Sequence, residues 1–225
     1  MSRTSMDMTR GSLKKQILFF SIPLMLSNLL QVLFNMSDIA VIGQFAGAMS
    51  LGAVGSTTTL ISMYTGFLIG LSGGINVLTA LYIGARNRKS VSETVHSAFL
   101  VSLVVGLILL ILGVSTSRGV LVLLNTKEEL IDKAALYIRI YFLGIPALAL
   151  YNFGNAVFSA AGDTGRPLRY LFLSGIVNVI LNLFFVIVCH MDVAGVALAS
   201  IISQYECVVS VPFGVSDRDG IVPES

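Results

Sequence analysis

The stretch QVLFNMSDIAVIG, residues 31–43, is almost wholly apolar, yet it contains Gln31, Asn35 and the carboxylate of Asp38. A charged carboxylate is costly to remove from water, so an acid within a lipid-spanning helix is expected to face a protein interior or a water-filled cavity. The stretch therefore indicates a membrane-spanning helix, and Asp38 is its first candidate functional residue.

The rest of the chain extends this interpretation. Of its 225 residues 55% are hydrophobic and only 12% are charged, a composition that is typical of a membrane protein. Each of the first five apolar stretches is at least as long as the roughly 20 residues that a helix needs to cross the hydrocarbon core. We expect an all-α polytopic protein with five full spans and an incomplete sixth, at about 16–42, 52–83, 94–114, 133–160, 168–188 and 193–205.

Basic residues predict the orientation, because they gather in cytoplasmic segments. They precede span one, follow span two, and lie between spans four and five, at Arg3, Arg10, Lys14, Lys15, Arg86, Arg88, Lys89, Arg166 and Arg169. We expect residues 1–15 to be a cytoplasmic segment. The protein would cross the plasma membrane several times, and we expect that membrane to be a bacterial inner membrane. The net charge of +2 then reflects topology and gives no reason to expect a nucleic-acid partner.

Polar residues of span one fall on one helical face. Ser21, Asn28, Gln31, Asn35 and Asp38 are separated by 7, 3, 4 and 3 residues. Asn28 and Gln31 fit either a cavity wall or hydrogen bonds between helices. A carboxylate has no structural use here that an amide would not serve at lower cost, so for Asp38 we favour a function.

Spans four and five carry polar faces of their own. Span four has Tyr137, Tyr141, Asn152 and Asn155, and span five has Ser174, Asn178 and Asn182 at intervals of four residues. These faces could enclose one cavity with span one. Within it Asp38 could bind and release a proton, or contribute an oxygen to a sodium site, and the sequence does not distinguish the two ions.

Other local patterns predict packing and helix ends. The glycines Gly66, Gly70 and Gly74 form a GxxxGxxxG ladder on span two, where a neighbouring helix could approach the backbone closely. Two capping boxes, Ser90 with Glu93 and Thr126 with Glu129, predict the starts of spans three and four.

Two chemical alternatives are weaker. Cys189, His190 and Asp192 resemble metal ligands, but a short polar turn explains them, and we expect no metal site. The GxSG motif around Ser72 is similar to that of intramembrane serine proteases, but His96 and His190 fall near helix ends, so neither is expected to reach a mid-membrane hydroxyl. We therefore do not expect an enzyme.

Several segments together resemble one family. QVLFNMSDIAVIG, YIGARN, AAGDTGRP, SGIVNVILNLFFVIV and MDVAGVALAS are similar to the N-terminal lobe of the multidrug and toxic compound extrusion (MATE) transporters, over roughly residues 12–205. The resemblance implies twelve helices in two six-helix lobes around a central cavity. It implies export of organic, commonly cationic compounds by alternating access, driven by protons or sodium ions, with no other cofactor.

The resemblance also implies roles for particular residues. The cation site would comprise Asp38 on span one, Asn178 and Asn182 on span five, Tyr137 and Asn155 on span four, and Ser200 on span six. The position of Asn182 is often Asp in the family, so Asp38 would act without a second acid. The remaining polar residues would line the cavity, namely Asn28, Gln31, Asn35, Tyr141, Asn152 and Ser174.

The end of the chain departs from the family. Residues 206–225, with Pro212 and Pro223, do not continue an apolar helix, and we interpret them as an atypical tail on a truncated lobe that spans 16–205. Such a chain would require a second lobe or another copy of itself, besides its substrate and membrane lipid. A lipid-linked oligosaccharide flippase of the same superfamily and a non-transporting remnant are the alternative functions.

Overall fold

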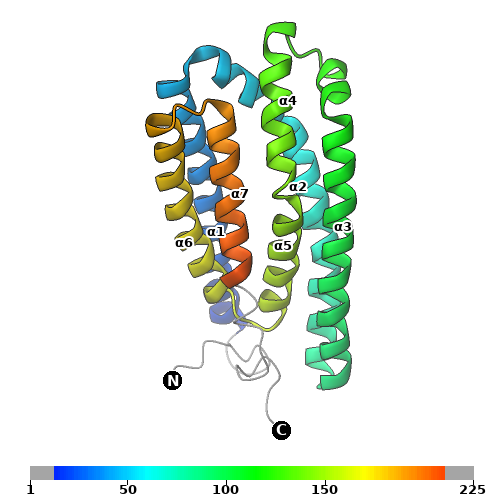
Figure 1. Cartoon of the computed structure of the whole chain (residues 1–225). Helices are drawn as coiled ribbons and strands as arrows, with labels where there is room; N and C mark the ends of the chain where they lie inside the picture. Colours follow the sequence, from blue (N-terminus) through cyan, green and yellow to red (C-terminus); the bar gives the residue numbers. More distant parts are fainter. Residues whose placement is uncertain (1–12, 211–225) are drawn as a thin grey trace.

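The computed structural model describes residues 13–210, and this part of the chain is helical, with short turns and no strand. The elements follow in the order α1 (Leu13–Val41), η1 (Ile42–Ala46), α2 (Gly47–Gly84), α3 (Arg88–Leu123), α4 (Glu128–Phe142), α5 (Ile145–Ala160), α6 (Gly165–Leu183), η2 (Phe184–Val188) and α7 (Val193–Ser210). The long helices lie side by side as one bundle (Figure 1). The expectation of an all-α polytopic lobe is confirmed.

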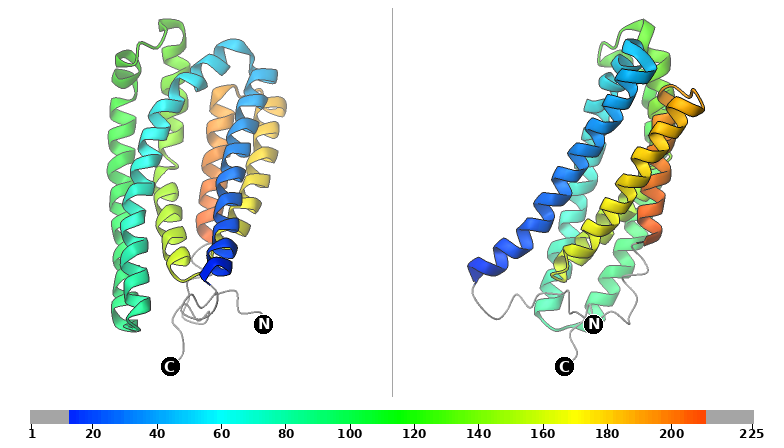
Figure 2. Two further views of the ribbon diagram at one scale, coloured as in Figure 1. Left: turned by 180° about the vertical axis from the view of Figure 1, so that it is seen from behind. Right: turned by 90° about the vertical axis from the view of Figure 1, so that its left-hand side faces the viewer.

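The apolar helices are long enough to cross a membrane. By length and composition three stretches qualify, Phe20–Gly84, Arg88–Leu123 and Gly165–Val188, and α4 with α5 adds a fourth as a pair bent by 49°. The first stretch has 65 residues, about three times the length that a membrane requires. It reverses direction near η1, so that α2 runs in the opposite direction to α1 (Figure 2). The stretch therefore supplies two spans.

The reversal between α1 and α2 depends on very little irregular backbone. The π-helical turn η1 continues α1, and Gly47 then takes a φ of 83°, in the left-handed region that favours glycine. Ala46, the residue before it, has right-handed helical angles, and the residues after it continue as the helix α2. Glycine at position 47 therefore provides the one left-handed residue of a reversal that is otherwise helical.

Two groups of helices meet along α7. One group contains α1, α6 and α7, and the other contains α2, α3, α4 and α5; α7 packs against α4 and α5 and so joins them (Figure 1). Their common core contains Ile42, Leu68, Ile138, Phe142 and Val196, each fully buried. The core therefore joins η1, α2, α4 and α7.

Close helix contacts depend on glycines of α3, not on the ladder of α2. A Cβ atom at Gly113 would lie 1.9 Å from the ring of Phe142, and one at Gly106 would lie 2.7 Å from the Cα of Pro146. Both contacts place α3 against the break between α4 and α5. At Gly66, Gly70 and Gly74 a Cβ would meet nothing within 4 Å. The close approach of a neighbouring helix that was predicted at the ladder is therefore not made by any helix within residues 13–210, because α2 packs through a different face.

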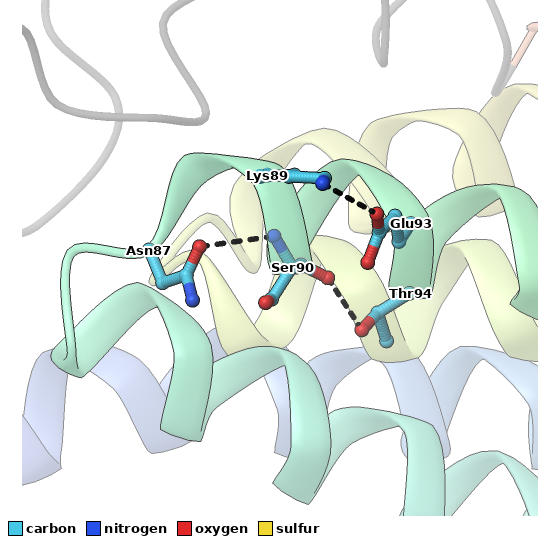
Figure 3. Close-up of polar contacts among 5 residues, drawn as sticks. All are labelled: Asn87, Lys89, Ser90, Glu93 and Thr94. Atoms are coloured by element: carbon cyan, nitrogen blue, oxygen red, sulfur yellow. Dashed lines mark hydrogen bonds and ion pairs between the residues drawn. The ribbon is translucent and has the colours of Figure 1, made fainter.

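The helix starts also differ from the sequence prediction. α3 begins at Arg88, and the side chain of Asn87 accepts a hydrogen bond from the backbone N–H of Ser90 at 3.1 Å (Figure 3). Ser90 lies inside the first turn, where its carbonyl accepts a hydrogen bond from Thr94, and so cannot be the cap. α4 begins at Glu128 without a side-chain cap bond, so the box expected at Thr126 does not form either.

The turns at one end of the bundle carry the basic residues. The α2–α3 turn with Arg86, Arg88 and Lys89 lies at the same end as the α5–α6 turn (Figure 1). At the opposite end Lys133 of α4 forms an ion pair with Asp192, in the turn before α7, and donates to Ser50 of α2 at 3.0 Å. α7 continues to Ser210, further than the sequence predicted, and residues 211–225 of the expected tail lie outside the described residues.

Candidate functional site

The carboxylate of Asp38 lies where α1, α6 and α7 meet. Asn182 of α6 donates a hydrogen bond from Nδ2 to Asp38 Oδ1, and Ser200 of α7 donates to Oδ2 at 3.4 Å. Asn182 is fully buried and Ser200 is 6% exposed, whereas Asp38 is half-buried. Both oxygens of the acid therefore face polar groups inside the lobe, as expected for a carboxylate that is not placed against lipid.

A hydrogen-bond network extends from Asp38 along α6 and α7. Asn182 also donates to the Oδ1 of Asn178 at 3.1 Å, and Asn178 donates to Ser203 Oγ at 3.4 Å. Ser174, one turn further along α6, donates to the backbone carbonyl of Ser203. The residues predicted at spacings of four on span five thus do form one continuous polar face.

One polar atom of this network lacks a protein partner. The Oδ1 of Asn182 is buried and has no hydrogen-bond partner among residues 13–210. Buried polar atoms are almost always satisfied, so an orphaned oxygen beside a carboxylate indicates a place for a water or a cation. Carboxylate, amide and hydroxyl oxygens together are ligands that a hard cation such as Na⁺ accepts, and the carboxylate can also take a proton.

Two of the predicted residues lie on α4, which packs against α7. The rings of Tyr137 and Tyr141 stack with centroids 6.0 Å apart, and Tyr137 is buried. The hydrogen-bonded cluster around Asp38 itself involves three helices, α1, α6 and α7.

Gly175 of α6 lets α1 come close enough for this contact. A Cβ atom at Gly175 would lie 1.8 Å from Cζ of Phe34, which is one turn before Asp38 on α1. Gly175, Asn178 and Asn182 are all buried on one face of α6. The ring of Phe34 therefore occupies the space of the missing side chain, and this sets the approach of Asp38 to Asn182.

α7 also contacts the break in span four. Tyr205 Oη donates to the carbonyl of Leu143 at 3.0 Å, and a Cβ at Gly144 would lie 2.5 Å from Oε1 of Gln204. The bend and the proline at position 146 leave carbonyls of this turn without their helical partners. Tyr205 satisfies one of them, next in sequence to Gln204, whose side chain lies against Gly144.

Several predicted site residues lie apart from the cluster. Tyr137 and Asn155 are 18 positions apart on the bent pair, about 25 Å along the helix axes, and no hydrogen bond among the described residues joins Asn155 to the cluster. Asn152 donates to the carbonyl of Leu148 in its own helix at 2.8 Å. The three residues of span one that were predicted to line the cavity, Asn28, Gln31 and Asn35, are exposed on α1.

The sequence analysis missed Ser203 and Gln204. Both follow Ser200 at helical spacings of three and four, which places them on the same side of α7. Their helical spacing from Ser200 could have indicated this shared face. It was passed over because both residues lie at the end of a span that the sequence analysis interpreted as incomplete. The position of Ser72 gives no support to a protease, since its hydroxyl donates to the carbonyl of Ile69 at 2.9 Å within α2.

Comparisons with known proteins agree on one family. The MatE family model matches residues 23–184. The chain is 36% identical over 200 residues to the probable multidrug resistance protein YpnP of Bacillus subtilis, covering 88% of this chain and 44% of the relative. It is 27% identical to the probable multidrug resistance protein YoeA of Bacillus subtilis, covering 77% of this chain and 37% of the relative.

A solved structure gives the same answer for the fold. The crystal structure described as MATE in the bent conformation matches with a TM-score of 0.88 and 25% identity, over 96% of this chain and 48% of that one. The chain therefore spans about half the length of the proteins that it matches.

Proposed function

Because this chain belongs to the MATE family of membrane transporters and corresponds to an N-terminal lobe, we propose that it is one lobe of a cation-coupled exporter of organic, cationic compounds. The observation that carries the proposal is the half-buried Asp38 carboxylate, hydrogen-bonded by Asn182 and Ser200 beside an unpartnered amide oxygen. The names of the matched relatives, multidrug resistance proteins, support the kind of cargo.

Asp38 is the residue that exchanges the coupling ion. With the ion bound, the charge of the carboxylate is neutralised inside the lobe. After release the hydrogen bonds that the structure shows to it, among residues 13–210, come from Asn182 and Ser200. A ligand that binds one conformation better than another shifts the equilibrium between them, so ion exchange at Asp38 drives the transport cycle. A second lobe, on a separate chain or another copy, provides the opposite wall of the cavity.

Ion binding can be tested on the purified chain without a transport assay. A bound cation stabilises the folded state by an amount that rises with its concentration, so titration with Na⁺ or with protons is expected to raise the thermal unfolding midpoint. Asp38→Asn is expected to abolish that response. Asp132→Asn is the matched control, because Asp132 lies at the opposite end of α4 from the break, with its side chain 82% exposed and paired with Arg118.

Export itself is tested in cells that make the chain alone or with the second lobe of a relative. Efflux of a fluorescent cationic dye is expected with wild type and with Asp132→Asn but not with Asp38→Asn. Separate collapse of the proton and the sodium gradient identifies the coupling ion. Normal efflux by Asp38→Asn would remove the acid from the mechanism, and a missing cation response in the purified wild type would remove the site.

The orientation is part of the proposal. The basic turns around Arg86 and Arg166 are placed in the cytoplasm of a bacterial cell, and the end with Lys133 and Asp192 on the outside. Cys189 is exposed near the outer end. We therefore expect an impermeant thiol reagent to label Cys189 in intact cells. Protection of Cys189 until the cells are lysed would reverse the topology.

A further inference from the structure

A groove between α1 and α6 opens on the outside of the bundle near its basic end. It has a volume of about 560 Å³ and is lined by Leu26 and Leu30 of α1 and by Leu168, Arg169, Phe172 and Leu173 of α6. All but one of these side chains are apolar. The groove does not include Asp38 or any other residue of the cation site.

The groove forms because α1 and α6 lie close together near the middle of α6 and further apart towards the basic end of the bundle. At Phe34 and Gly175 the ring of α1 fills the place of a side chain on α6. One to two turns nearer the basic end, larger side chains face each other and prevent the same approach. Leu26, Phe172 and Leu173 are 44%, 49% and 55% exposed there, so the described chain leaves the groove uncovered.

Arg169 gives the groove its chemical character. It lies in the second turn of α6, and among residues 13–210 no acidic side chain forms an ion pair with it. The neighbouring Arg166 is bound to Asp163, with Nε 2.8 Å from Oδ2, so it does not supply the charge. A cation at the membrane-surface end of an apolar groove is complementary to a molecule with an anionic head and a hydrocarbon tail.

We propose that this groove binds one anionic phospholipid of the leaflet at the basic end, with an acyl chain against Leu26, Leu30 and Leu173 and the phosphate at Arg169. An apolar groove in a bilayer is in contact with acyl chains, and the guanidinium adds hydrogen bonds and charge that select the head group. Zwitterionic lipids fill the same groove but balance the charge of Arg169 less well.

Native mass spectrometry of the purified full chain tests the proposal. The chain is mixed with phosphatidylglycerol and phosphatidylcholine that carry the same acyl chains, and the ratio of the two retained lipids is measured. Wild type is expected to retain more phosphatidylglycerol, and Arg169→Gln is expected to lower the ratio about fivefold. Arg86→Gln, which removes an exposed arginine at the same end of the bundle but outside the groove, is the control and should not change it.

A second variant tests the apolar part. Leu26→Trp fills the groove at an exposed position and is expected to reduce retention of both lipids. The proposal is overturned if Arg169→Gln keeps the wild-type ratio, or if Arg86→Gln lowers it equally, which would indicate diffuse attraction to the membrane. It is also overturned if wild type binds inorganic phosphate through Arg169 but retains neither lipid, or if the spectra show a dimer that Leu26→Trp dissociates, since the groove would then bind free phosphate or a second copy.

Discussion

Substituting Gly175 by alanine tests whether the approach of α1 to α6 sets the cation site. The added Cβ would lie 1.8 Å from Cζ of Phe34 and within 2.4 Å of both neighbouring ring atoms. Non-bonded carbon atoms pack at about 3.5 Å or more, so the ring must move by about 1.7 Å. Rotation of the ring does not relieve a contact with its tip, and α1 has to move away.

The expected cost follows from two opposing terms. Alanine favours a helix over glycine by about 1 kcal/mol, whereas overpacking of a close contact costs about 1–3 kcal/mol. A distance as short as 1.8 Å places the clash in the upper half of that range, so the net loss is expected to be about 1–2 kcal/mol, or about 2–8 °C in the unfolding midpoint. A displacement of about 1.7 Å also takes Asp38 out of hydrogen-bond range of Asn182, so the cation response should weaken.

The measurement is thermal unfolding of the purified chain with and without the coupling cation. Gly70→Ala is the matched control, because nothing lies within 4 Å of a Cβ there, and it should be neutral or slightly stabilising. Adding Phe34→Leu to Gly175→Ala should restore both the midpoint and the cation response. A single Gly175→Ala variant that unfolds and responds like wild type would refute the proposed role of this contact.

Three further outcomes are expected. Asn87→Ala should destabilise the chain by about 1 kcal/mol in thermal unfolding, while Ser90→Ala, which removes no cap bond, should cost much less. Burial raises the pKa of Asp192, but hydrogen bonds from Lys133 and Ser50 outweigh it and hold that pKa below its usual value. The ion pair therefore stabilises the fold above about pH 4, and this stability is lost as the pH falls through the folded-state pKa. Lys133→Met should flatten this acid dependence of the unfolding midpoint. Tyr205→Phe should broaden the distribution of α4–α5 bend angles in spin-label distance measurements, whereas an unchanged distribution would show that its bond to the break is unimportant.

The spans and the central acid could be predicted from the sequence, because both depend on the cost of placing polar groups in lipid. That cost acts on residue types and run lengths, which are visible in the chain. The same reasoning favoured a protein-facing position for Asp38, and the structure places it against Asn182 and Ser200. The structure also brings Ser174, Asn178 and Asn182 into one network, as their spacing indicated.

Contacts that depend on which face of a helix is covered could not be predicted in this way. The glycines of α2 and α3 look alike in sequence, but a Cβ atom would come within 3 Å of another helix only at Gly106 and Gly113, because the break at Pro146 lies against α3. Similarly, Asn87 and Ser90 are both good caps, and only the path of the preceding turn decides between them. The contact of Gln204 with Gly144 requires the bend itself, which hydropathy does not report.

The left-handed φ of Gly47 limits which residues the junction of α1 and α2 can accept. A Cβ atom at this position would meet nothing within 4 Å, so space is not the constraint, but an L side chain rarely adopts a φ of 83°. Because Ile42, five residues earlier, is fully buried, the backbone cannot relieve that strain by displacing the end of this segment from the core. The junction therefore requires glycine for its backbone conformation and not for its small size.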